Sequence, residues 1–421
     1  MFEKTTFPSG LRLLTVPMNH VASAAVLVMA KAGSRYERQR INGLAHFLEH
    51  MFFKGSRRYP TAKKISLAIE GVGGTINGWT DLEEAAYWVK VPKRHLNKGI
   101  DLLGDIVLNS KFDPLEIERE RGVILEEINR REDNPEQRVL EVLFEALFPN
   151  HPLGRRTLGT KEIIKKISQQ DFLTYFKNFY RPGDMIVAVG GRIEKGEVAK
   201  EVASQFLFPT KTTPGDFEKF KDTQVSPVVN VYPKKTEQAH LVLGLKTFPA
   251  GHPDRFTLAV LDSLLGKGIS SRLFQNIREK KGLAYSIYSA HDFYQDTGVF
   301  LIHAGLNLGK VKEAILATLE ELRLLKEKEV SPRELSQAKE KIKGPLTFIL
   351  EEPMTLATFF THQELLEKEV LAPQEMMERI DKVTVNDIKR LAKDLFLAQK
   401  LNLALVGPFE DRQGFQKLLE F

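Results

Sequence analysis

The sequence predicts an α+β fold of two tandem homologous domains, each a mainly antiparallel sheet with helices packed on one face. Three observations lead to this prediction. The chain has 421 residues, which exceeds the size at which a single hydrophobic core stops growing. A pattern of short segments recurs along the chain at one fixed interval. Within each copy, helices cluster between strands without strict alternation, which disfavours a doubly wound parallel sheet.

The internal repeat is clearest where the segments IIKKISQQDF and RPGDMIVAVGG recur as RIDKVTVNDI and AQKLNLALVG. Asp171 then corresponds to Asp387, and this pair defines the offset between the two copies. The same offset aligns the strand-like residues 24–29 with residues 240–245. We therefore interpret the chain as one fold that is encoded twice.

Each copy is expected to contain a short strand, a second apolar strand, a buried helix, a strand pair, several amphipathic helices and a final strand. Residues 208–228, between the copies, are rich in Pro, Lys, Asp and Thr and lack periodicity. We place the domain boundary in this segment. Residues 1–215 then form the N-terminal domain and residues 216–421 the C-terminal domain.

The composition restricts the class of protein. Hydrophobic residues make up 42% of the chain, which is ample for globular folding. The first residues, MFEKTTFPSGLRLL, lack the apolar core of a secretory signal, and no run of 18 apolar residues occurs. We therefore expect a cytoplasmic protein without a membrane partner. Because the chain has no cysteine, any zinc site must use imidazole and carboxylate ligands.

The net charge of +6 raises the question of a nucleic-acid partner. Lys and Arg are interleaved with Glu along residues 116–131, which is typical of a solvated helix face. No zinc-finger, RNA-binding or helix-turn-helix signature accompanies the charge. We therefore expect no nucleic-acid partner.

A candidate metal site lies in residues 43–53, GLAHFLEHMFF, which are predicted to form a helix that is apolar on nearly every side. His46, Glu49 and His50 share one stripe of this helix at spacings of three and four. Buried imidazoles and carboxylates need partners. Two histidines one helical turn apart can bind a single zinc ion, and Glu49 beside them is placed to activate a water.

A satisfied core position is the ordinary interpretation of a lone histidine on an apolar helix. The complete pattern His-x-x-Glu-His is uncommon by chance and favours a metal. A catalytic zinc site uses three protein ligands and keeps one position open, so a third ligand is required.

The helix predicted to follow Asp113 offers two candidates for the third ligand. Glu120 and Glu127 share one stripe of this helix, because two full turns return a helix to nearly the same direction. A solvated face is the usual explanation for glutamates, but this stripe also contains Val123 and Ile124. The pattern therefore favours a functional role for both carboxylates.

These motifs resemble the pitrilysin family of inverzincins, which includes insulysin and the mitochondrial processing peptidase, and whose signature is His-x-x-Glu-His followed by a Glu at a set distance further along the chain. Counted from His50, that position is Glu127. The resemblance implies one Zn2+ per chain, bound by His46, His50 and Glu127. It further implies that Glu49 is the general base and that Glu120 supports the ligand set.

The resemblance covers almost the whole chain and is strongest with the half-length branch, which contains the β subunit of the mitochondrial processing peptidase and its bacterial homologues. FFKG at 52–55, the Gly pair at 73–74 and HPLG at 151–154 match in order. On residue pattern alone, the Gly pair predicts a tight turn. The resemblance implies in addition a strand that binds the substrate backbone and contains Gly74, Thr75, Ile76 and Asn77.

The second copy has no candidate metal site. The offset places Asp262, Leu265 and Gly266 opposite the helix motif, and Lys343 opposite Glu127. On residue pattern alone, Arg278 and Tyr285 in this copy are a helix-surface charge and a strand aromatic. The resemblance implies instead that Arg278 and Tyr285 bind the substrate carbonyl and stabilise the oxyanion of the tetrahedral intermediate.

The function expected from the resemblance is a zinc metalloendopeptidase that hydrolyses peptides or unfolded polypeptide segments inside a dimer chamber. Because the zinc motif and the Arg and Tyr pair occur on one chain, we expect a homodimer. In the half-length branch, Tyr285 would act on the zinc site of the partner subunit. The alternative is a noncatalytic assembly or binding subunit of the same fold.

Overall fold

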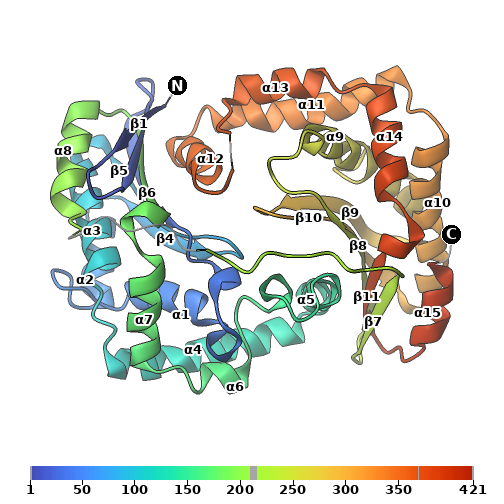
Figure 1. Cartoon of the computed structure of the whole chain (residues 1–421), viewed down its shortest axis with the longest axis horizontal. Helices are drawn as coiled ribbons and strands as arrows, with labels where there is room; N and C mark the ends of the chain where they lie inside the picture. The colour runs from blue at the N-terminus through green and yellow to red at the C-terminus, as the bar shows by residue number, and fades with distance from the viewer. Residues whose placement is uncertain (1, 209–215, 368, 420–421) are drawn as a thin grey trace. The chain divides into compact units, whose positions relative to one another are not determined.

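The computed structural model describes residues 2–208, 216–367 and 369–419, which fall into two compact units (Figure 1). Unit 1 consists of Met1–Ile128, Arg155–Glu218 and Phe348–Ala372, and unit 2 of Asn129–Gly154, Lys219–Thr347 and Pro373–Phe421. Two segments, 129–154 and 348–372, therefore belong to the unit built mainly from the opposite half of the sequence. The domain boundary predicted at residue 215 falls in residues 209–215, outside the described part of the chain.

The sheet of unit 1 has the strand order β1 (Glu3–Thr6), β2 (Arg12–Pro17), β6 (Met185–Gly191), β3 (Ser23–Ala30), β5 (Ala85–Pro92) and β4 (Thr75–Thr80). Strands β2 and β6 pair in parallel, and all other neighbouring strands of this sheet pair antiparallel. The central strand β3 reads SAAVLVMA and is buried on both faces after its first residue. A continuous apolar run of this kind requires cover on both sides of a sheet.

Helices cover one face of this sheet and enclose the larger core of unit 1. Val26, Val28 and Val89 from the strands pack there with apolar residues of the helices, such as Phe47 and Ile100. The helices of this part of the chain are α1 (Leu44–Phe52), α2 (Ala62–Glu70), α3 (Leu96–Leu108), α4 (Pro114–Asp133), α6 (Lys161–Ile164), α7 (Gln169–Phe179) and α8 (Lys195–Gln205).

The opposite face of the sheet is covered by α12 (Pro353–Leu366). Leu27 and Ala188 form a second apolar cluster there with Leu356 and Phe360 of this helix. The approach is close at Gly190, where a Cβ atom would lie 2.7 Å from the Pro353 carbonyl oxygen. The predicted packing of helices on one face is thus supplemented by a single helix from a distant part of the sequence.

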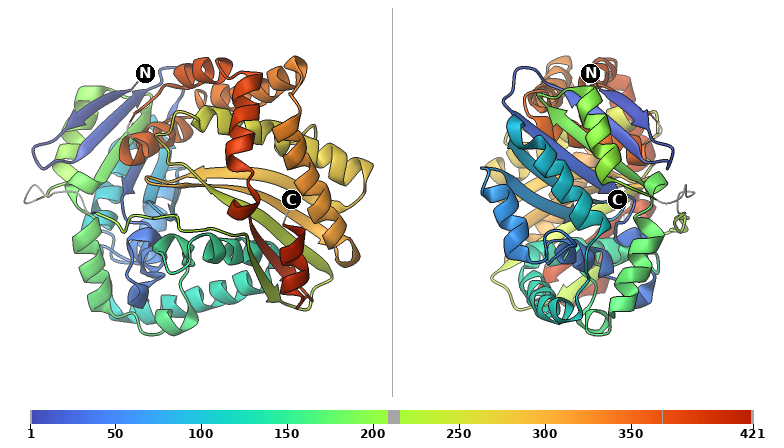
Figure 2. Two further views of the ribbon diagram at one scale, coloured as in Figure 1. Left: turned by 45° about the vertical axis from the view of Figure 1, so that its right-hand side comes forward. Right: turned by 90° about the vertical axis from the view of Figure 1, so that its left-hand side faces the viewer.

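The sheet of unit 2 has the strand order β7 (Val228–Pro233), β11 (Asn402–Gly407), β8 (Gln238–Thr247), β10 (Gly298–Asn307) and β9 (Ala284–Phe293). This order matches β2, β6, β3, β5 and β4 of unit 1. Figure 2 shows β9 and β10 side by side. The unit also contains α9 (Arg255–Leu265), α10 (Val311–Glu327), α11 (Pro332–Ile349), α13 (Pro373–Asp381), α14 (Val385–Leu395) and α15 (Arg412–Leu418). Helix α5 (Pro135–Leu147) also packs on β8, where Leu143 contacts Gly244.

The repeat extends to local detail. Helix α7 begins with a capping box formed by Ser168 and Asp171, and α14 begins with one formed by Thr384 and Asp387. Both boxes satisfy backbone N–H groups at the helix start, and they occupy corresponding positions in the two copies. Together with the matching strand orders, they confirm the predicted α+β class and its two homologous copies.

No helix of the described residues combines the length and apolar character required to cross a bilayer.

Candidate metal centre

Helix α1 carries the His-x-x-Glu-His motif. It begins after Gly43, whose φ of 95° lies in the left-handed region, where glycine is favoured. Phe47 and Leu48 are fully buried in the core of unit 1. The helix therefore docks through its apolar stripe and presents His46 and His50 along another side, as its periodicity predicts.

Helix α4 brings the two candidate carboxylates to the same place. Its start is as predicted: Asp113 accepts hydrogen bonds from the N–H groups of Leu115 at 2.8 Å and Glu116 at 3.4 Å. Glu120 is buried, at 5% exposure. The prediction that Val123 belongs to a buried stripe is wrong, because this residue is 49% exposed.

The structure brings His46, His50 and Glu127 together, with one possible ligand atom of each within 4.8 Å of the others. Glu127 Oε2 lies 3.6 Å from His46 Nε2 and 3.8 Å from His50 Nε2. These separations exceed normal hydrogen-bond lengths. Ligands held at about 2.0–2.2 Å around one tetrahedral zinc ion would lie roughly 3.3–3.6 Å apart, so the cluster is close to the size that a zinc ion requires.

Glu120 fixes the orientation of one imidazole. Its Oε1 lies 2.8 Å from His50 Nδ1. Because an ionised carboxylate only accepts hydrogen bonds, Nδ1 carries a proton, and the other ring nitrogen, Nε2, faces the cluster. Burial raises the pKa of Glu120, but hydrogen bonds from His50 and Lys54 outweigh that effect and hold the pKa below its usual value. Glu120 is therefore ionised and suited to support a metal-binding histidine.

Lys54 is a member of this network to which the sequence interpretation gave no role. Its Nζ lies 2.5 Å from Glu120 Oε2. Lys54 follows α1, whereas Glu120 lies on α4, so no spacing within one element could have related the two residues. An ammonium group here neutralises Glu120 and leaves the charge of Glu127 for a cation.

Glu49 stands beside the cluster and bonds to the sheet. Its Oε2 accepts a hydrogen bond of 2.7 Å from Thr80 Oγ1. Burial raises the pKa of Glu49; the Thr80 hydrogen bond and His50 oppose the increase, and Glu127 adds to it. A carboxylate with a raised pKa is a better proton acceptor at neutral pH. Thr80 is a second residue for which the sequence suggested no role.

Thr80 ends β4, the strand in which substrate contacts were predicted. Among the described strands, β4 pairs with β5 alone and so forms an edge of the sheet. Gly73, with φ of 74°, makes the predicted tight turn before it. Of the four residues predicted to contact substrate, Gly74 precedes the strand, and Thr75, Ile76 and Asn77 lie in it.

Arg278 and Tyr285 lie in unit 2. Arg278 belongs to a short π-helical segment, Phe274–Lys280, and Tyr285 lies at the start of β9. The guanidinium carbon of Arg278 is 4.5 Å from the centre of the Phe274 ring and 6.0 Å from that of Tyr285. The Tyr285 side chain is exposed. The two side chains are therefore neighbours on one surface of unit 2.

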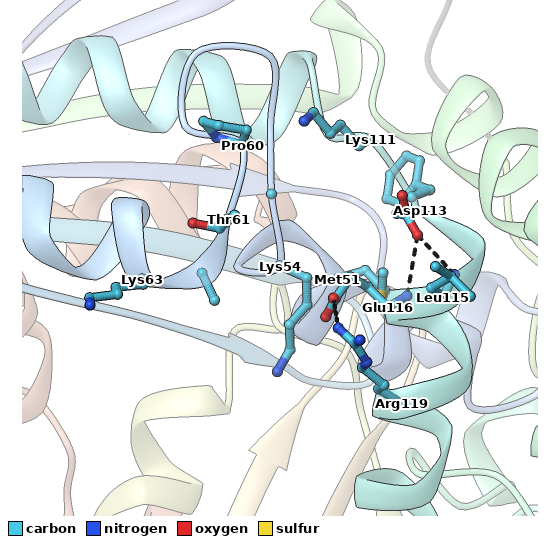
Figure 3. Close-up of a pocket in the computed structure, with 13 residues that line it drawn as sticks. Met51, Lys54, Pro60, Thr61, Lys63, Lys111, Asp113, Leu115, Glu116 and Arg119 are labelled. Carbon is cyan, nitrogen blue, oxygen red and sulfur yellow. Dashed lines mark hydrogen bonds and ion pairs between the residues drawn. The ribbon is translucent and has the colours of Figure 1, made fainter.

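A pocket of about 410 Å³ opens beside the C-terminal end of α1. Lys54 and Met51 contribute to its wall, together with Pro60 and the start of α4 (Figure 3). The three clustered ligand residues do not line it. The pocket therefore lies beside Lys54 and is separate from the three clustered residues.

The two histidines of the His-x-x-Glu-His motif and the carboxylate of Glu127 form a group that could hold a metal ion, and this donor set suits zinc. Residues 13–161 match the family "Insulinase (Peptidase family M16)", and residues 166–342 match the "Peptidase M16 inactive domain". The chain belongs to the M16 peptidase family, with an N-terminal peptidase domain and an inactive C-terminal domain.

Relatives of similar length support this assignment. The "Uncharacterized zinc protease YmxG" of Bacillus subtilis is 34% identical over 97% of this chain and 98% of its own. An uncharacterized zinc protease of Streptomyces coelicolor is 32% identical over 98% of this chain and 91% of its own.

Solved structures share the fold. A protease from Helicobacter pylori superposes with a TM-score of 0.90 at 25% identity, over 97% of this chain and 99% of the other. A chain of "Complex III2 from Candida albicans" superposes with a TM-score of 0.85 at 18% identity, over 99% of each chain. The latter likeness shows the fold alone.

Proposed function

We propose that this protein is a zinc-dependent endopeptidase that hydrolyses peptides or unfolded polypeptide segments. The convergence of His46, His50 and Glu127 on one point, with Glu49 beside them, is the observation that carries the proposal. Membership of the M16 family and relatives named zinc proteases support it.

His46, His50 and Glu127 would hold one Zn2+ per chain, and Glu120 would keep the His50 ring in place. A bound zinc ion supplies Lewis acidity, which polarises a carbonyl group and makes a water molecule more acidic. Three protein ligands leave one position open, as a catalytic site requires. The donor set of two imidazoles and a carboxylate suits zinc without any thiolate.

Glu49 would be the general base. It accepts a proton from the attacking water as the water oxygen bonds to the scissile carbonyl carbon. It then donates that proton to the leaving nitrogen as the C–N bond breaks, which yields a carboxylate and an amine. The Thr80 hydroxyl, 2.7 Å from Glu49 Oε2, keeps the carboxylate oriented during both transfers.

The open edge of β4 would bind the substrate backbone. An extended peptide that adds to a sheet edge forms main-chain hydrogen bonds that demand little of its sequence. Thr75, Ile76 and Asn77 offer that edge, and β4 leads directly to Thr80 beside Glu49. Folded proteins lack a free extended segment, so the substrates would be peptides or unfolded chains.

Arg278 and Tyr285 would bind the substrate carbonyl and stabilise the oxyanion in a homodimer whose subunits enclose a chamber. Tyr285 would serve the zinc centre of the partner subunit. Co-refolding Glu49→Gln with Tyr285→Phe subunits tests this role, because about half the dimers should be mixed. In a mixed dimer one site combines two intact residues, so about a quarter of all sites should recover activity. Activity at the parental level, despite demonstrated subunit exchange, contradicts action across the dimer.

The alternative is a noncatalytic assembly or binding subunit of the same fold. A noncatalytic subunit has no need of a general base beside a complete ligand set. The combination of Glu49, Thr80 and the three ligands therefore favours the peptidase.

Metal analysis and peptide cleavage test the function together. We expect one zinc per chain, cleavage of an unstructured peptide library, loss of cleavage with a chelator and recovery with added zinc. Mass spectrometry of the products identifies the cleaved bonds. A pure protein that binds zinc and cleaves none of the library would favour the noncatalytic alternative.

A further inference from the structure

The start of α1 depends on a carboxylate from outside the helix. Glu37 precedes the helix and lies between two short 3-10 turns, Ser34–Tyr36 and Gln39–Ile41. Its side chain is buried, at 2% exposure. The backbone carbonyl of Glu37 accepts a hydrogen bond of 2.8 Å from the Arg155 guanidinium. The residue is therefore held at both its main chain and its side chain.

The residue that would ordinarily cap α1 cannot do so. Helix N-termini leave backbone N–H groups without helical partners, and a polar side chain at the N-cap position usually accepts one of them. Here the N-cap is Gly43, which has no side chain. A Cβ atom at Gly43 would lie 2.5 Å from the Leu158 carbonyl oxygen. Tertiary packing thus excludes a local cap.

Glu37 supplies the missing cap with both oxygens. Its Oε2 accepts from the N–H of Gly43 at 2.8 Å, and its Oε1 accepts from the N–H of Ala45 at 2.6 Å. Asn42 Nδ2 donates a third hydrogen bond of 2.8 Å to Oε2. A carboxylate that spans two N–H groups at a helix start fixes both the position and the rotation of the first turn.

Such a buried carboxylate is costly, and its place in the chain indicates what it does. Burial raises the pKa of Glu37 to about 7, although hydrogen bonds from Ala45, Asn42 and Gly43 and the charge of Arg155 oppose the increase. Helices α7 and α14 are capped at lower cost by more exposed Ser, Thr and Asp side chains. The buried cap, Glu37, occurs on α1. One of the two N–H groups that it accepts belongs to Ala45, which directly precedes His46.

We propose that Glu37 is a positioning residue of the metal centre, whose buried carboxylate fixes the first turn of α1 and thereby the places of His46 and Glu49. It acts through the backbone of the helix and touches neither metal ligand nor substrate. His50, one turn further on, is held from the other side by Glu120. Glu37 and Glu120 would thus secure the two ends of the motif from different parts of unit 1.

The test is Glu37→Gln, which keeps the size of the side chain and replaces one acceptor oxygen with an NH2 donor that faces an N–H donor. The matched control is Asp387→Asn, which damages the cap of α14 in unit 2. Zinc affinity is measured by competition with a chromophoric chelator, the metal geometry by the visible spectrum of the Co2+-substituted protein, and folding by thermal unfolding. Peptide cleavage gives kcat and KM separately.

We expect Glu37→Gln to weaken zinc binding about tenfold, as loss of supporting residues around metal sites does, to change the Co2+ spectrum and to lower kcat with little change in KM. Asp387→Asn should lose thermal stability and keep wild-type zinc affinity and spectrum. Glu37→Gln with the same pattern as the control overturns the proposal. If Glu37→Gln does not fold, Asn42→Ala replaces it: zinc binding weakened threefold or more supports the proposal, and unchanged binding overturns it.

This inference rests on the proposed zinc chemistry, and the two can fail separately. A wild-type protein that binds no zinc would refute the proposed function. Zinc bound equally well by wild type and Glu37→Gln would refute only the role of Glu37.

Discussion

Helices α1 and α9 occupy corresponding places in the two copies, and each buries polar side chains in a different way. Asp262 of α9 corresponds to His46 of α1 at the offset that relates the copies. Asp262 Oδ2 lies 2.7 Å from His291 Nδ1 and 3.2 Å from Lys267 Nζ. Its Oδ1 accepts a hydrogen bond from the Ser289 hydroxyl. These charged and polar partners all belong to the same copy.

In α1 the corresponding region brings possible metal-ligand atoms together. His50 Nε2 and Glu127 Oε2 lie 3.8 Å apart, which is beyond normal hydrogen-bond length. Buried polar groups need partners, and a cation provides a common partner for several acceptors at once. The second copy satisfies its buried aspartate with protein groups and needs no metal, whereas the first is arranged to receive one.

The largest loss of peptide cleavage should follow substitution of Glu49, which corresponds to the apolar Leu265 of α9. Glu49→Gln should lower kcat about 10³-fold through loss of the general base and keep near-normal zinc. Peptide cleavage and metal analysis on the same sample test this. Loss of zinc in the variant would instead place Glu49 among the ligands.

Removal of the second copy's buried acid should damage stability and leave the metal centre intact. Asp262→Ala removes the acceptor of the hydrogen bonds from Ser289 and His291, and leaving buried donors unsatisfied costs about 1–3 kcal/mol. Urea unfolding should show this loss, and chelator competition should show unchanged zinc affinity. Zinc affinity that falls together with stability would mean that the two copies are coupled.

Removal of Glu127, the proposed third ligand, should weaken zinc binding and leave folding intact, which is the converse of the result expected for Asp262. Glu127→Gln should weaken zinc binding by at least about 100-fold, because loss of a residue that only supports a ligand already costs about 10–100-fold. The control is Glu126→Gln, an exposed neighbour on the same helix, which should bind zinc normally. Normal zinc in Glu127→Gln would remove that residue from the ligand set.

The smallest effect concerns pH. Burial raises the pKa of Asp262, but His291, Lys267 and Ser289 outweigh it, so the pKa lies below its ordinary value. A carboxyl group whose pKa is lower in the folded state stabilises the fold above its unfolded pKa and loses that contribution as the pH falls through the folded pKa. Wild type should therefore lose more unfolding free energy than Asp262→Asn as the pH falls below about 4, the ordinary pKa of an aspartate. Equal losses would contradict this assignment.

The helical periodicity and the repeat carried most of the fold prediction. The His-x-x-Glu-His spacing placed His46, Glu49 and His50 on one side of α1, and the interval of two helical turns placed Glu120 and Glu127 together on α4. The error at Val123 arose because a stripe on a helix has edges, and packing decides how far burial extends across it.

The supporting contacts had no comparable signal in the sequence. Lys54 and Glu120 belong to segments that are distant in the sequence, and so do Thr80 and Glu49. Glu37 reaches Gly43 and Ala45 across an irregular segment with no period at all. A helix or strand period relates only residues within one element, so such contacts cannot be read from spacing.

The sequence by itself determined the α+β class, the twofold repeat and the residues that occupy the proposed metal-facing sides of α1 and α4, because periodicity along one element and recurrence along the chain are local properties. Only the tertiary structure decided that α5 and α12 pack in the unit opposite to their place in the sequence, that Lys54 and Thr80 contact Glu120 and Glu49, and that Glu37 caps α1. The physical reason is that both faces of a buried sheet and every buried polar group must find partners, and the chain supplies them from wherever folding brings a suitable group.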